Sequence, residues 1–208
     1  MDWSQIIVAS ISATATILSV ILGKIWVTRR TKQKICDPII SDVEISTHIE
    51  TCLELILSET GSDRAYVMQF HNGGYYRSGK SQQKFSCTHE CCTLGTSKEH
   101  HRSQNHLISN FHNYIHLLVN NGEYYYTNAG DIKDESFKNL VLSKGVISLF
   151  NVPLKTLDGK VIGILGVDYV KKKADPIFLH CDQIEIRNRE EMKDFLRSQG
   201  RIISAYLI

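Results

Sequence analysis

Apolar residues follow three different patterns along this chain, and each pattern predicts a different kind of structure. Residues 6–27 are almost continuously apolar, with Lys24 as their only charge, and are long enough to span a bilayer as a helix. Residues 45–56 repeat apolar positions at helical spacing, which predicts an amphipathic helix. Residues 145–170 predict two strands joined by a tight turn, and the second strand is apolar on both faces, which places it in the middle of a sheet.

Shorter patterns between that helix and the final hairpin predict strands, helices and polar loops. The signal Asn72-Gly73-Gly74 is expected to end the first strand in a turn, and Asp134 is expected to cap a helix. Gly200 is expected to interrupt the last helix. The expected elements are strands at residues 64–71, 84–92, 123–127, 146–154 and 161–170, helices at residues 107–118, 135–144 and 192–206, and polar loops at residues 78–83 and 95–105.

The strand at residues 64–71 has two faces of different character. Tyr66 and Met68 lie on one face, whereas the other carries Gln69 and His71 and becomes more polar toward the turn. A strand that buries one face and directs polar groups into a cavity has this pattern. An edge strand whose second face is exposed to solvent has the same pattern, so both interpretations stay open.

The apolar run at residues 6–27 is interpreted as an uncleaved membrane anchor. Asp2 precedes it and Arg29 and Arg30 follow it, which is the reverse of a secretory signal peptide. The positive-inside rule places the amino terminus outside and the rest in the cytosol, with one crossing of an inner or plasma membrane. A buried core helix is the alternative. The predicted parts are an anchor at residues 1–28, a basic connector at residues 29–42 and a cytosolic domain at residues 43–208.

Composition limits the classes of binding partner that we expect, and it leaves the fold prediction unchanged. The chain is 42% hydrophobic and 22% charged, as expected of a folded protein. Its formal net charge of +2 is too small to predict nucleic-acid binding. In the reducing cytosol its six cysteines are not expected to form disulfides.

The sequence SLFNVPL at residues 148–154, followed by GKVIGIL at residues 159–165, resembles the closing hairpin of GAF domains. The resemblance extends over residues 43–170 and implies an α+β fold with a central antiparallel sheet flanked by helices. It implies that the terminal helices pack together on one face, that a small-molecule pocket lies on the other, and that two copies pair through those helices. The residue sets of cyclic-nucleotide-binding and bilin-attaching members are absent, so those two ligands are disfavoured.

Histidine and cysteine are concentrated in the middle of the chain, and both are preferred ligands of zinc. On an unbroken strand Cys87, His89 and Cys91 point the same way, but they lie too far apart to share one ion without a bend. His112 and His116, one helical turn apart, form a better pair. A zinc site drawn from these five residues is one interpretation, and scattered surface histidines with buried thiols are the other.

A thiol-redox protein similar to the GAF-fold reductases of free methionine sulfoxide is another alternative. It rests on the clustering of Cys87, Cys91 and Cys92. A nucleophilic thiol requires a lowered pKa, which His89 or Lys84 would have to provide. The sequence contains no convincing catalytic motif, so an enzyme is not expected.

The sequence patterns predict a membrane anchor, and the resemblance to GAF domains implies a sensory or regulatory module that binds an unidentified small molecule. It would signal by helix pairing in a homodimer or by recruiting an effector. A scaffold protein that keeps the fold without a ligand is the alternative. The candidate ligand-binding residues are Gln69, His71, Tyr75, Cys87, His89 and Asp168.

Overall fold

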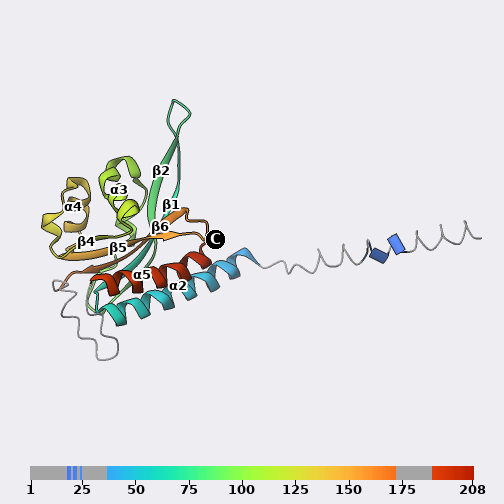
Figure 1. Ribbon diagram of the computed structural model, residues 1–208, viewed down its shortest axis with the longest axis horizontal. Helices are drawn as coiled ribbons and strands as arrows, with labels where there is room; N and C mark the ends of the chain where they lie inside the picture. Colours follow the sequence, from blue (N-terminus) through green and yellow to red (C-terminus); the bar gives the residue numbers. More distant parts are fainter. Residues whose placement is uncertain (1–17, 20, 23, 25–36, 172–188) are drawn as a thin grey trace, which may run out of the picture. The chain divides into compact units, whose positions relative to one another are not determined.

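The final hairpin forms the middle of a six-stranded antiparallel sheet with the strand order β3-β2-β1-β6-β5-β4 (Figure 1). β6 (Val161–Tyr169) lies between β1 (Arg64–Tyr75) and β5 (Ser148–Lys155), as its two apolar faces predict. The outer strands are β2 (Ser81–Cys92), β3 (His106–Leu107) and β4 (Tyr124–Tyr126). The predicted α+β class with an antiparallel sheet is confirmed.

The computed structural model describes residues 18–19, 21–22, 24, 37–171 and 189–208. The chain divides into two compact units, Met1–Asp42 and Val43–Ile208, and the sheet belongs to the second. None of the described helices is both long and apolar enough to cross a membrane. Most of the expected anchor at residues 6–27, and the basic part of the connector, lie outside the described residues.

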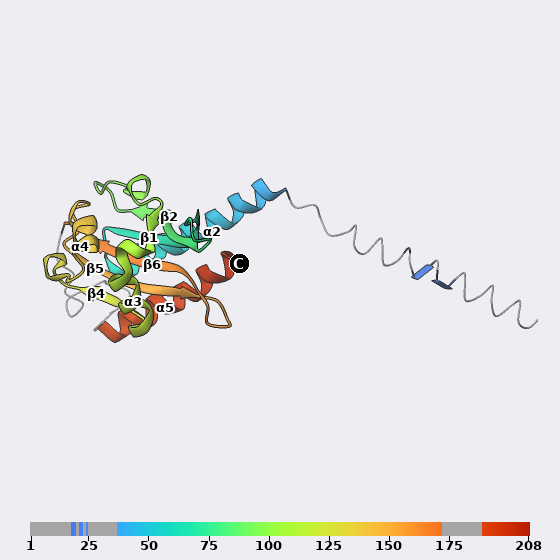
Figure 2. The ribbon, with the colours of Figure 1, turned by 90° about the horizontal axis from the view of Figure 1, so that it is seen from above.

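Helices cover both faces of the sheet (Figures 1 and 2). On one face α2 (Pro38–Thr60) and α5 (Arg189–Tyr206) lie side by side, and the rings of His48 and Tyr206 stack with their centroids 5.0 Å apart. The other face is covered by α3 (His112–Asn121), α4 (Glu135–Leu142) and three short 3-10 helices. The 3-10 helices are η1 (His100–Arg102), η2 (Ile108–Phe111) and η3 (Ala129–Asp131).

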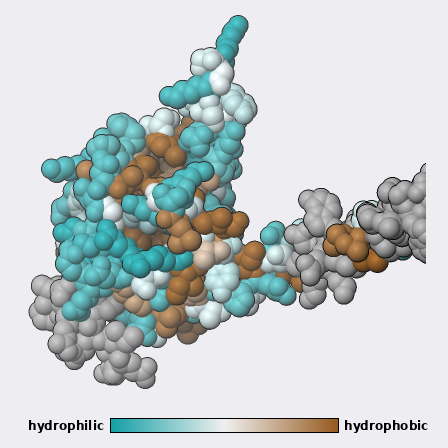
Figure 3. All heavy atoms as spheres, turned by 45° about the vertical axis from the view of Figure 1, so that its right-hand side comes forward, coloured by the Kyte–Doolittle hydropathy of each residue, from teal (hydrophilic) through white to brown (hydrophobic). Residues whose placement is uncertain are grey.

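The β1–β2 hairpin is longer than the sequence pattern predicts. Asn72-Gly73-Gly74 does not end the strand: the Asn72 side chain accepts a hydrogen bond from Gly74 N at 3.0 Å, and Gly74 adopts a φ of 104° within a strand irregularity. The turn follows at residues 76–80, where Tyr76 N donates to Lys80 O. The prolonged hairpin projects from the rest of the sheet, and its end is mostly hydrophilic (Figure 3).

The helix predicted at residues 107–118 is wrong at its start, because Leu107 pairs in β3 and α3 begins only at His112. The predicted cap of α4 is confirmed, since Asp134 accepts a hydrogen bond from Phe137 N at 3.0 Å. Gly200 does not interrupt α5. It lies where the helix contacts the side chain of Leu154 on β5, so its small size permits close packing.

Candidate functional site

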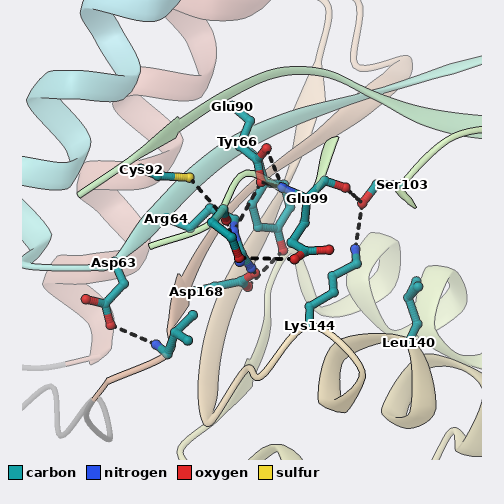
Figure 4. Close-up of polar contacts among 12 residues, drawn as sticks. Asp63, Arg64, Tyr66, Glu90, Cys92, Glu99, Ser103, Leu140, Lys144 and Asp168 are labelled. Carbon is teal, nitrogen blue, oxygen red and sulfur yellow. Dashed lines mark hydrogen bonds and ion pairs between the residues drawn. The ribbon is translucent and has the colours of Figure 1, made fainter. Parts of the chain in front are cut away.

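A buried charged cluster occupies the sheet face that is covered by α3 and α4 (Figure 4). At its centre Arg64 is only 2% exposed. Its Nε lies 3.1 Å from Glu90 Oε1, and its Nη1 lies 3.0 Å from Asp168 Oδ2. Arg64 pairs with Asp168 across β1 and β6, and Glu90 pairs with Tyr66 across β2 and β1, so strand register brings the charges together.

A chain of hydrogen bonds links this cluster to the aromatic core. The Tyr66 hydroxyl lies 3.3 Å from Asp168 Oδ1 and 2.9 Å from Asn151 Oδ1. Asn151 Nδ2 then donates to the hydroxyl of Tyr114 on α3 at 2.8 Å. Burial raises the pKa of Tyr66 well above its usual value, so the hydroxyl stays protonated and available as a donor.

The loop at residues 93–105 covers the cluster and is tied to it by charge-assisted hydrogen bonds. The Glu90 carboxylate accepts from Glu99 N at 2.8 Å and from His100 N at 2.9 Å. Arg64 Nη2 donates to Ser97 O at 3.1 Å. Because ionised partners make these bonds stronger than neutral ones, the charged cluster holds the 93–105 loop against the sheet.

Lys144 approaches the cluster from the segment that follows α4. Its Nζ donates to Ser103 Oγ at 2.7 Å, and no other acceptor in the described part of the chain lies within hydrogen-bonding distance. Burial lowers the pKa of Lys144, although Asp168 partly opposes this effect. An ammonium group has three donors, so Lys144 keeps unused hydrogen-bonding capacity beside the cluster.

A cavity of about 10 Å³ lies among these groups. That volume is about the size needed for one water molecule. Burial raises the pKa of the Asp168 carboxyl, and Arg64 and Lys144 oppose the shift. The residues that line the cavity are Arg64, Tyr66, Met68, Cys87, Glu90, Glu99, Ser103, Lys144 and Asp168.

Solved structures with a similar fold include GAF domains. The third GAF domain of Slr1393 from Synechocystis sp. PCC6803 aligns with a TM-score of 0.57 and 8% identity, over 78% of this chain and 92% of that one. The chain has a GAF-like fold. The PixJ GAF domain of Thermosynechococcus elongatus aligns with a TM-score of 0.52 and 15% identity, over 79% of this chain and 94% of that one. The GAF domain/HD domain protein of Geobacter sulfurreducens aligns with a TM-score of 0.52 and 10% identity, over 78% of this chain and 91% of that one. A scan against protein-family models and a search of curated proteins both find no match.

The GAF-like domain brings only two of the six expected ligand-binding residues to the cavity, Cys87 and Asp168. Gln69 alternates with Met68 and so lies on the opposite sheet face, and His71 bonds Ser86 Oγ at 2.8 Å. Tyr75 is 70% exposed on the projecting hairpin. The polar face of β1 therefore does not line this cavity.

His89 also lies away from the cavity, because β2 contains a bulge. Val67 pairs with His89 and Met68 with Cys87, so Thr88 is the extra residue. Cys87 packs in the core under α3, whereas His89 Nε2 lies 3.3 Å from Ser46 Oγ on α2. The expectation that Cys87, His89 and Cys91 point the same way is wrong, because an inserted residue reverses the alternation of faces.

The five predicted zinc ligands are dispersed over the GAF-like domain. Cys91 Sγ contacts Glu50 O on α2 at 3.8 Å, His112 is exposed, and His116 bonds Asn120 at 2.9 Å. Within residues 37–171 and 189–208, no three His, Cys, Asp or Glu side chains gather in a group that could hold a metal ion. The structure does not assemble the expected set.

The thiols do not meet the electrostatic requirement for nucleophilic chemistry. Burial raises the pKa of Cys87 to about 12 and that of Cys91 to about 11, and it also raises the pKa of Cys92. His89 lies on the other sheet face from Cys87 and does not activate it. Raised pKa values leave these cysteines as neutral thiols at physiological pH.

Sequence reasoning missed Arg64, Glu90 and Lys144 as members of the site. Arg64 and Tyr66 share a face of the first strand, and a charge on an otherwise apolar strand face was the available signal. Glu90 stands at the corresponding position of β2, but its alignment depends on the Thr88 bulge. Lys144 carried no sequence signal, since it belongs to no periodic pattern.

Proposed function

We propose that this chain is a sensory module whose GAF-like domain binds a small polar molecule at the cavity beside Lys144. The observation that carries the proposal is the ammonium of Lys144, which is held beside a polar cavity and has Ser103 Oγ as its single acceptor among the described residues. A ligand with a carbonyl, carboxylate or phosphate oxygen would use the remaining donors. Arg64 would provide a further positive charge next to that oxygen.

The energetic cost of the cluster supports a functional role. Burying paired charges is often neutral or unfavourable compared with packing apolar side chains of similar volume. Buried ionisable groups with shifted pKa values are concentrated at functional sites. Arg64 and Asp168 are a buried ion pair with shifted pKa values, and burial also lowers the pKa of the neighbouring Lys144.

Binding of anything larger than water requires the 93–105 loop to move. The cavity of about 10 Å³ has no room for a metabolite in the present conformation. The loop is held by Glu90 and Arg64, which are also the groups that a polar ligand would engage. Ligand binding would therefore compete with loop closure, which makes the loop the first responsive element.

The cluster is connected to the end of α2 and to the point where the chain leaves β6. Tyr169, next to Asp168, donates its hydroxyl to Thr60 O at the end of α2 at 3.0 Å. Asp63, next to Arg64, accepts from Lys171 N at 2.9 Å where the chain leaves β6. A ligand that displaces Arg64 or Asp168 would thus alter the end of α2 and the residues that directly follow β6.

The cellular part of the proposal rests on sequence. We propose that residues 6–27 anchor the chain once in an inner or plasma membrane, with the GAF-like domain in the cytosol. Signalling would proceed through pairing of two copies by their long helices or through a recruited effector, without nucleic acid. Photoreceptor domains among the proteins of similar fold support a sensory role by analogy.

A ligand-free scaffold is the second candidate, and one observation favours it. The cavity is nearly filled by the protein's own side chains, and the charges of Arg64 are compensated by Glu90 and Asp168. In that case the cluster would serve only to fix the 93–105 loop. The two candidates differ in whether any molecule stabilises the domain through Lys144.

The deciding experiment is native mass spectrometry of the full chain released from detergent micelles, followed by thermal unfolding with each molecule found. The sensory proposal expects a bound mass that raises the unfolding temperature of the wild type and is lost in Lys144→Met. Lys133→Met, which removes an exposed lysine near α4, is the matched control and should retain the ligand. Binding that is equal in both variants, or no bound molecule from any source extract, would favour the scaffold.

A further inference from the structure

A second pocket of the GAF-like domain lies at the edge of the sheet, where α5 crosses β5. It has a volume of about 180 Å³, far larger than the cavity at Lys144. Three of its six lining residues are cationic and two are glycines. The lining residues are Gly122, Pro153, Lys155, Arg197, Gly200 and Arg201.

The pocket forms where the edge of the sheet loses a strand. β4 begins at Tyr124, which pairs with Asn151, and the same register would place Gly122 opposite Pro153. Pro153 has no N–H to offer a further partner, so pairing stops and the second half of β5 is left at the edge. The space beside Pro153 and Lys155 is then bounded by α5.

Among the described residues, the cations of this pocket have no carboxylate partner. α5 carries a basic residue at every fourth position from 189 to 201. The first two are paired, Arg189 with Glu123 and Lys193 with Glu190. Arg197 and Arg201 have no carboxylate within 4.0 Å in the described part of the chain, and neither has Lys155.

The geometry fixes one of these cations in place. Arg197 Nη2 donates to Gly122 O at 3.3 Å, directly after α3. A side chain at Gly122 would collide with the Arg197 guanidinium, and a side chain at Gly200 would meet Leu154. The absence of side chains at Gly122 and Gly200 thus lets Arg197 and Leu154 pack closely against the backbone that lines the pocket.

We propose that this pocket binds a phosphate group, carried either by a soluble phosphate compound or by a lipid headgroup. Arginine presents planar donor pairs that match phosphate oxygens, and lysine adds a point charge. The pocket volume leaves room for part of the molecule that carries the phosphate. This site is separate from the proposed sensory site and does not depend on a ligand at Lys144.

The test follows the backbone amide signals of Gly122 and Gly200 by NMR, with the full chain in zwitterionic micelles. Added inorganic phosphate should shift both signals saturably at constant ionic strength. In Arg201→Gln, which removes an exposed side chain, and in Arg197→Gln, the affinity should fall roughly tenfold to a hundredfold, the value expected for losing a charged hydrogen bond. Lys193→Gln, on the same helix but paired with Glu190, is the matched control and should bind as the wild type does.

One further addition identifies the source of the phosphate group. Micelles doped with a phosphorylated phosphatidylinositol should shift the same glycine signals if the headgroup is the ligand, and should leave them at their phosphate-free positions if the ligand is a soluble compound. Equal shifts with chloride at the same ionic strength would overturn the proposal. So would the absence of saturable shifts with both phosphate probes, or an equal loss of affinity in Lys193→Gln.

Discussion

The two faces of the sheet are built on different principles. The face under α2 and α5 is an aliphatic core, in which Leu53, Val67 and Leu165 are fully buried. The face under α3 and α4 is rich in aromatic rings and ends in the charged cluster around Arg64. Both faces are contributed by the same strands, because alternate residues of β1 and β6 point to opposite sides.

The two faces therefore contribute to the stability of the domain in different ways. An aliphatic core gains free energy from burial in proportion to area and tolerates gradual change. A buried charged network is satisfied only when each partner is present, so removing one member leaves others uncompensated. The α2/α5 face is therefore suited to holding the domain together, whereas the stability of the α3/α4 face depends on every member of the charged cluster.

The largest effect is expected from Arg64→Met, which leaves Glu90 and Asp168 buried without their cation. The free energy of unfolding should fall by about 3–5 kcal/mol, measured by chemical denaturation. Adding Asp168→Asn to Arg64→Met should recover part of this loss, because it removes one uncompensated charge. A loss below about 1 kcal/mol would show that the cluster is not a coupled network.

Leu53→Ala probes the aliphatic face and should cost about 3 kcal/mol, from lost burial and the cavity left behind. Leu53 is fully buried between α2 and the sheet. No second polar substitution should rescue it, in contrast to the pair on the other face. Thermal unfolding of Leu53→Ala alone and combined with Asp168→Asn would test this independence, since distant sites should add.

Asp134→Ala should have a smaller effect, about 1–2 kcal/mol, because it removes the cap of α4. The Asp134 carboxylate also accepts from Tyr114 N at 3.1 Å, so the change affects two helices on the α3/α4 face. Asp134→Asn, which keeps an acceptor oxygen, is the control and should lose less. Equal losses in the two variants would mean that the charge, and not the cap, matters.

The smallest effect is expected in the pH dependence of stability. It can be tested with one histidine on each face of the sheet. Burial lowers the pKa of His106, which contacts Phe85 and Phe111, and that of His89, which lies beside α2. A lowered folded-state pKa gives stability that is present above about pH 6.5 and is lost as pH falls through the folded value. The wild type should therefore lose stability between pH 7 and 5.

Replacing either histidine by glutamine should flatten that pH dependence, measured as the free energy of unfolding at several pH values. The exposed His112 provides the control, and His112→Gln should leave the slope unchanged. If only His106→Gln flattens the curve, acid sensitivity belongs to the α3/α4 face. If neither replacement changes the pH dependence of the free energy of unfolding, the lowered histidine pKa values are not its cause.

Much of the fold follows from local periodicity. The closing hairpin, the long helix that follows Asp37 and the carboxy-terminal helix were all predicted, because each repeats its apolar positions over many residues. The separation of Tyr66 and Met68 from Gln69 and His71 on β1 was predicted as well. The predictions were wrong where a single residue changes the course of a strand. Thr88 forms a bulge in β2, and Gly74 lies within β1 and does not end it.

The sequence by itself determined which residues of each strand share a face, because side chains alternate along a strand wherever it folds. Only the tertiary structure decided which charges meet. Arg64, Glu90, Lys144 and Asp168 are far apart in the chain and become neighbours through strand register, the β2 bulge and the end of α4. Register depends on pairing across the whole sheet, so no local pattern could place the cluster.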